Sequence, residues 1–184
     1  MVTIINGSHR HGHSWKIAQG LCTQLNSFGI NIALIDLAVA NIDFCCGSQI
    51  CQETECINKQ DEFFNRYKEI IISSDGIFII TPTYFNMPTA KLKNFIDRSN
   101  ALLPFFENAS KQPFFGAYVC GEADSESIKC HLDLLKEYAT IMGWENIEQL
   151  NFVENVADVS QVDYNEIIKL ANIIKSQLQS RWKT

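Results

Sequence analysis

The densest group of reactive side chains lies near the N-terminus, in the nine residues GSHRHGHSW at positions 7–15. This stretch contains two serines, one arginine and three of the chain's four histidines. A short β-branched run, residues 2–6, precedes it, and apolar residues at helical spacing follow it. Because backbone amides at the start of a helix bind anions, a loop between a strand and a helix favours an anionic ligand, here a phosphate monoester.

Two other interpretations of this stretch stay open. The alternating His9, His11 and His13 could ligate zinc or nickel, although a loop that turns into a helix rarely holds three imidazoles together. The stretch could also be a capped turn without any ligand. It is not a Walker loop, because Gly12 is not followed by Lys and Ser/Thr, and it is not the GxGxxG dinucleotide fingerprint.

Two later loops offer complementary chemistry. The segment TPTYFNMP, residues 81–88, places Tyr84 and Phe85 beside Asn86, and such side chains can line and hydrogen-bond a flat heterocycle. The segment CGEADSES, residues 120–127, offers Gly121 for close backbone approach and a helix N-cap at Asp124 or Ser125. Each loop alone is equally typical of core aromatics or of an ordinary turn. These loops indicate a ligand site only if they lie in one crevice together with residues 7–15.

A fourth loop concentrates thiols, with Cys45, Cys46, Cys51 and Cys56 close together in the sequence. Four thiolates in a short segment can bind a [4Fe–4S] cluster or zinc. They can also be reduced cysteines that pack as small hydrophobes. A redox-active thiol pair is a third alternative, but no flanking basic residue favours a lowered thiol pKa.

The elements that must position these loops alternate along the chain. Strand-like apolar runs at residues 2–6, 31–37, 76–80, 114–120 and 147–153 alternate with helical patterns that end in a terminal helix over residues 164–182. The run at 76–80 is apolar on both faces, as in a parallel sheet covered by helices. The alternation predicts an α/β fold with an open, doubly wound, five-stranded parallel sheet. Ligands of such sheets bind beyond the carboxyl ends of the strands, which directs attention to residues 7–15, 81–88 and 120–126.

Length and composition set the remaining bounds. The 184 residues suit one domain, and 46% hydrophobic with 20% charged residues is typical of a soluble globular protein. A net charge of −6 argues against nucleic acid and anionic membrane as partners. No apolar run approaches the roughly 20 residues of a membrane span, and no signal-peptide pattern opens the sequence. Seven cysteines, an odd number, then favour a reducing cytoplasm over a disulfide framework.

Together these stretches resemble the NADPH-dependent FMN reductase-like branch of the flavodoxin-like superfamily, and especially its iron-sulfur flavoproteins. The resemblance rests on GSHRHGHSW, on CCGSQICQETEC and most specifically on DGIFIITPTYFNMPTAKLKNFIDR, and it covers roughly residues 1–145. It implies a single flavodoxin-like FMN-binding domain over residues 1–184. The sheet would carry helices on both faces.

The resemblance also assigns residues. Those expected at the FMN phosphate are Ser8, Arg10, His13 and Ser14, with Trp15 as their neighbour. Those expected along the isoalloxazine ring are Pro82, Thr83, Tyr84, Phe85 and Asn86, and those over its other edge are Cys120, Gly121 and Glu122. Cys45, Cys51 and Cys56 stand near three of the family's four cluster-ligand positions, Ser48 occupies the other, and Cys46 is the remaining thiol. Arg98 is expected to anchor its helix or an oligomer contact.

The expected function is that of an FMN-dependent oxidoreductase, in which hydride passes from NADH or NADPH through the flavin to a quinone, a free flavin or another small acceptor. An electron carrier, with FMN and an iron-sulfur cluster, is the first alternative. A cofactor-free regulatory protein of the same fold is the second. The resemblance further implies a homodimer or homotetramer, with ALLPFF at residues 101–106 as a candidate contact surface.

Overall fold

The fold is built on one sheet of five parallel strands in the order β2-β1-β3-β4-β5. A computed structural model describes the chain except for residues 49, 53–55, 108, 123–124, 157–160 and 182–184. The strands are β1 (Val2–Asn6), β2 (Ile32–Asp36), β3 (Gly76–Pro82), β4 (Phe114–Gly121) and β5 (Glu145–Asn155). The predicted doubly wound α/β architecture is confirmed. The strand order reverses between β1 and β3, which is where such sheets bind ligands.

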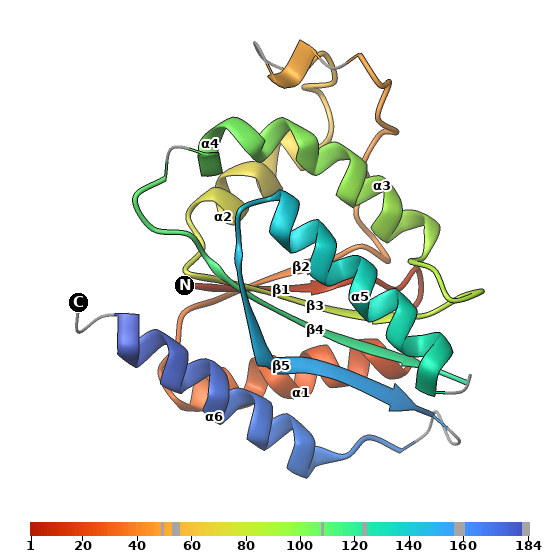
Figure 1. Cartoon of the computed structure of the whole chain (residues 1–184), viewed down its shortest axis with the longest axis vertical. Coiled ribbons are helices and arrows are strands. Elements are labelled where there is room, and N and C mark those ends of the chain that lie inside the picture. The colour runs from red at the N-terminus through yellow and green to blue at the C-terminus, as the bar shows by residue number, and fades with distance from the viewer. Residues whose placement is uncertain (49, 53–55, 108, 123–124, 157–160, 182–184) are drawn as a thin grey trace.

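Helices cover both faces of the sheet (Figure 1). The α-helices are α1 (His13–Ser27), α2 (Lys68–Ile72), α3 (Ala90–Ser99), α4 (Leu103–Glu107), α5 (Ser125–Ile141) and α6 (Tyr164–Arg181). Helices α1 and α6 lie together on one face, and α2, α3 and α5 lie on the other (Figure 1). Side chains of β3 alternate between the two cores: Ile77 and Ile79 pack under the α3–α5 face, and Phe78 and Ile80 pack under α1 and α6.

Two elements differ from their predicted form. The helix expected from Asp61 onward begins as a π-helix, η2 (Phe63–Tyr67), and continues as the short α2. Strand β5 extends beyond the apolar run that predicted it, because its pairing with β4 continues on both sides of a register shift between Phe115 and Ala117. Backbone pairing of this kind leaves no trace in hydrophobic patterning.

The stretch expected as an oligomer contact packs mainly against its own domain. It forms a 3₁₀ turn, η3 (Asn100–Leu102), and the start of α4, in which Ala101, Leu102 and Phe106 are buried while Phe105 is exposed. Most apolar side chains of this segment therefore pack on the protein's own core, and the oligomer contact stays a prediction. Among the described helices, none is both long enough and apolar enough to cross a membrane.

Candidate functional site

The loops that follow β1, β3 and β4 meet at the carboxyl edge of the sheet and enclose an open cavity of about 740 Å³. This volume lies within the range of small-molecule sites. Its lining residues are Ser8, Arg10, His11, Gly12, His13, Ser14, Lys16, Pro82, Thr83, Tyr84, Phe85, Asn86, Cys120, Gly121, Glu122 and Val156. The structure therefore brings together every residue predicted at the ligand except Trp15.

The first wall of the cavity is the N-terminus of α1. Its N-cap, Gly12, offers no side-chain hydrogen bond to the first turn, and that turn contains no acidic residue. Amides at the start of this 15-residue helix thus keep their positive potential toward the cavity. An anionic group such as a phosphate matches both the amides and the neighbouring Arg10.

Asn6, the last residue of β1, holds this loop through hydrogen bonds of its side chain. Its side-chain oxygen accepts hydrogen bonds from the backbone N–H of Ser8 and from Ser14 Oγ, both at 3.4 Å. Its Nδ2 donates to Asp36 Oδ1 at 2.8 Å, which ties the loop to the end of β2. Ser8 Oγ in turn accepts from the backbone N–H of Arg10 at 3.2 Å. The loop is thus shaped by its own polar side chains.

The three histidines of the loop point to different partners. The ring of His9 lies 5.2 Å from that of Tyr84, between centroids. His11 Nε2 lies 2.6 Å from Asp36 Oδ2, and the buried His13 places its Nε2 2.8 Å from Glu154 Oε2 on β5. Because the imidazoles diverge, they pin the loop to its neighbours and do not form a metal site.

Trp15 lies outside the cavity lining, contrary to the prediction. Its indole stacks on the His11 ring, with the two ring centroids 4.3 Å apart. His11, and not Trp15, lines the cavity. Four lining residues were missed from the sequence: His11, Gly12, Lys16 and Val156. Val156 could have been found, because it follows the fifth strand and the rule that selected the other three loops applies there too.

The opposite wall comes from the loops after β3 and β4. A Cβ on Gly121 would lie 2.5 Å from Thr83 Cγ2, so this close approach needs glycine. Thr83 Oγ1 is buried and has no hydrogen-bond partner among the described residues. Cys120 is buried beside them, and burial raises the pKa of its thiol to about 12, so it stays neutral at physiological pH. The wall therefore presents uncharged groups, with Glu122 exposed at the rim.

The cysteine loop lies elsewhere, against α3 and α5. The four cysteines line a separate cavity of about 500 Å³. Cys45 and Cys46 are exposed, whereas Cys51 is buried and its sulfur accepts a hydrogen bond from Asn100 Nδ2 at 3.3 Å. Hydrogen bonds from Ser48 lower the pKa of the Cys46 thiol, and the positive charge of Arg98 adds to this effect.

The described residues do not gather three His, Cys, Asp or Glu side chains in an arrangement that could hold a metal ion. As the described side chains stand, they are not grouped as ligands of an iron-sulfur cluster or of zinc. The ligand set Cys45, Cys46, Cys51 and Cys56 thus stays a prediction from the sequence.

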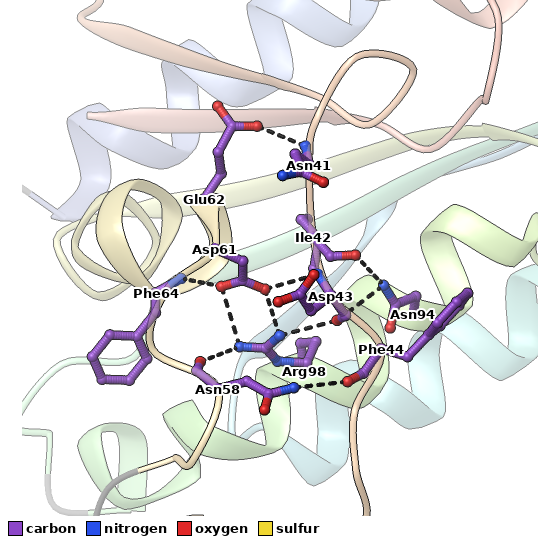
Figure 2. A network of polar contacts seen from close by, with 10 residues as sticks. All are labelled: Asn41, Ile42, Asp43, Phe44, Asn58, Asp61, Glu62, Phe64, Asn94 and Arg98. Carbon is purple, nitrogen blue, oxygen red and sulfur yellow. Dashed lines mark hydrogen bonds and ion pairs between the residues drawn. The ribbon is translucent and has the colours of Figure 1, made fainter.

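A buried arginine holds both ends of the cysteine loop (Figure 2). Arg98 Nη1 on α3 donates to Asp61 Oδ2 at 2.5 Å and to the carbonyl oxygen of Asp43 at 3.0 Å. Its Nη2 donates to the carbonyl oxygen of Asn58 at 2.7 Å. Asp61 is equally buried and also accepts from the backbone N–H groups of Asp43 and Phe64. The predicted anchoring of the helix is therefore observed, and the anchor is attached to the cysteine loop.

The sequence matches one protein family over most of its length. The family described as NADPH-dependent FMN reductase matches residues 1–156. An iron-sulfur flavoprotein of Clostridioides difficile is 31% identical over 147 residues, which cover 66% of this chain and 65% of that protein. The chain spans between about half and two thirds of the length of the curated relatives that it matches first.

Solved structures agree in fold. A flavone reductase superimposes with a TM-score of 0.69 at 13% identity, covering 98% of this chain and 64% of its own. A flavodoxin, WrbA-like protein from Agrobacterium tumefaciens gives a TM-score of 0.64 at 16% identity, covering 96% of this chain and 98% of its own. The fold is flavodoxin-like.

Proposed function

The chain belongs to the NADPH-dependent FMN reductase family, and on that premise we propose that it is an FMN-dependent oxidoreductase that transfers hydride equivalents from NADH or NADPH to a small acceptor such as a quinone. The observation that carries this proposal is the α1 N-terminus, which opens into a ligand-sized cavity without a side-chain cap or an acidic first turn. This end suits a phosphate monoester. The uncharged wall opposite suits a flat heterocycle.

The chain's own residues would bind and orient the cofactor. Ser8, Ser14 and the amides at the start of α1 would surround the phosphate, and Arg10 would add a charged donor. Pro82, Thr83 and Tyr84 would line the ring, and Cys120 and Gly121, on the same wall, would cover its other edge. The unpartnered hydroxyl of Thr83 supports this fit, since a bound heterocycle could offer it a hydrogen bond.

When bound, FMN supplies the two-electron chemistry between the two substrates. In the overall reaction NAD(P)H gives up a hydride, and a quinone takes up those two electrons with two protons, one of which comes from solvent. The direct test is to titrate the purified protein with FMN and then to measure NADH and NADPH oxidation with a quinone present, without oxygen. Absence of FMN binding would refute the proposal. FMN binding without nicotinamide oxidation would favour the electron-carrier alternative.

Arg10→Ala is expected to raise the FMN dissociation constant about tenfold, because an exposed charge-assisted hydrogen bond to phosphate contributes about 1.5 kcal/mol. Quenching of flavin fluorescence on binding measures the constant. Arg66→Ala is the matched control, since Arg66 is exposed and does not line the cavity. An unchanged constant for Arg10→Ala would remove this arginine from the phosphate site.

Thr83→Val tests the opposite wall without removing bulk. The free energy of unfolding of the apoprotein should stay the same or rise, because the lost hydroxyl is buried and unpaired among the described residues. FMN affinity should fall by about 3–10-fold, the effect of one neutral hydrogen bond. Urea unfolding and flavin titration measure the two quantities. If stability falls and affinity does not, the hydroxyl serves the fold and not the ligand.

A further inference from the structure

The turn that connects β3 to α3 holds an aromatic residue in an unfavourable conformation. Tyr84 and Met87 exchange both backbone hydrogen bonds, at 3.1 and 3.0 Å, and so close a two-residue turn. The two residues inside it, Phe85 and Asn86, have φ angles of 49° and 60°. They are the only non-glycine residues with positive φ among those that the structure describes. Asparagine tolerates this left-handed region, but phenylalanine does so poorly.

The side chain of Phe85 is also placed unfavourably. Its relative exposure is 102%, so the ring packs against none of the described residues, and Met87 beside it is half exposed. A fully exposed phenylalanine forgoes the gain that burial of its ring would provide. Strained backbone and an unburied aromatic ring therefore coincide at one residue. Such strain tends to occur at functional sites.

This residue stands at the mouth of the cavity. Phe85 is among the lining residues, and the β3–α3 connection that carries it projects beyond the carboxyl ends of the strands (Figure 1). Pro82, Thr83 and Tyr84, which precede it, are partly buried and form the wall itself. The exposed ring of Phe85 thus lies on the outer side of the cavity. A ligand that enters after the inner part of the cavity is filled would contact it there.

We infer that Phe85 is a specificity-determining residue that stacks on the planar ring of the second substrate, a quinone or similar aromatic acceptor, and contributes little to FMN binding. The inference rests on the proposed function. The turn fixes the backbone of Phe85 before the substrate arrives, so little backbone freedom is lost on binding. Offset stacking of two aromatic rings supplies the attraction. The paired backbone of Tyr84 and Met87 holds this turn, and with it the backbone position from which the Phe85 ring projects.

The test compares Phe85→Ala, Phe85→Gly and Phe85→Tyr in the FMN-loaded protein. Both Phe85→Ala and Phe85→Gly should raise the KM for a water-soluble naphthoquinone sulfonate about tenfold, whereas Phe85→Tyr, which keeps a ring, should change it less than twofold. Calorimetric titration with the same quinone, without nicotinamide, should show the same loss of affinity. Turnover with ferricyanide, which is not a planar ring, should fall less than turnover with the quinone. Phe85→Gly should also melt at a higher temperature than Phe85→Ala, because glycine accepts the positive φ.

The outcomes separate this inference from the proposed function. If the wild-type protein fails to bind FMN, the proposed function falls. If FMN binds and the nicotinamide is oxidised, but the quinone KM is unchanged in Phe85→Ala, the inference alone is overturned. It is equally overturned if the FMN dissociation constant rises in parallel with the quinone KM, or if Phe85→Ala changes the oligomeric state seen by light scattering, since the ring would then contact the flavin or a second copy of the chain.

Discussion

Replacement of Arg98 by alanine is expected to destabilise the fold by about 3–5 kcal/mol, the usual effect of removing one partner of a buried ion pair. The guanidinium is 1% exposed and the carboxylate of Asp61 is equally buried, so the variant would leave a buried charge without its counter-ion. The carbonyl oxygens of Asp43 and Asn58 would each lose the arginine donor at the same time, although Asp43 would keep its hydrogen bond from Asn94 Nδ2. Urea unfolding followed by far-ultraviolet circular dichroism measures the free energy.

Two comparisons distinguish this anchor from a general effect of charge removal. Arg66→Ala should change the free energy of unfolding by less than about 0.5 kcal/mol, because its pair with Glu62 is exposed. Arg98→Lys should recover only part of the loss, since an ammonium group cannot reproduce the fork that reaches Asp61, Asp43 and Asn58 together. A loss below 1 kcal/mol for Arg98→Ala would contradict the argument.

The same variant should alter the cysteine loop before the protein unfolds. Arg98 joins the two ends of that loop through Asp43 and Asn58, and Cys51 inside it is buried. Without the Arg98 side chain we expect Cys51 to react faster with a thiol reagent under native conditions. Peptide mass spectrometry would measure this rate. Cys22 on α1, buried in the core on the opposite face of the sheet from Arg98, provides the internal control. Equal acceleration at both thiols would indicate global unfolding and no specific role at the loop.

The sequence was most informative where one local pattern determines one local structure. The apolar run at residues 76–80 predicted a strand of a parallel sheet covered on both faces, and these residues are buried in β3. Alternation along the chain predicted the doubly wound architecture. The rule that ligands bind beyond strand ends then selected the three loops that enclose the cavity. Only loop positions relative to strands were needed for that step.

Contacts between distant residues could not be predicted in this way. His13 contacts Glu154, 141 positions away, His11 contacts Asp36, and His9 lies beside Tyr84. The histidines that could have formed a metal motif therefore attach one loop to three different neighbours. Arg98 could be suspected as an anchor, but its partners Asp43 and Asn58 lie in a segment without periodicity. Side-chain direction in irregular loops depends on the packed neighbours, which a single sequence does not identify.

Acidification is expected to destabilise the protein through His131 on α5. This imidazole is fully buried, and neither ring nitrogen has a hydrogen-bond partner among the described residues. Burial disfavours its charged form and lowers its pKa from 6.5 to about 4. Between these values the unfolded chain binds a proton that the folded chain does not. The loss of folding stability caused by His131 is thus absent above pH 6.5, grows as the pH falls toward 4, and reaches about 3 kcal/mol below pH 4.

The substitution His131→Leu isolates this effect from the titration of the carboxylates. The variant keeps an apolar side chain in the site and removes the group that must stay neutral, so its free energy of unfolding should fall less than that of the wild type between pH 7 and pH 4.5. If wild type and His131→Leu lose stability in parallel over this range, the buried imidazole does not govern the acid response.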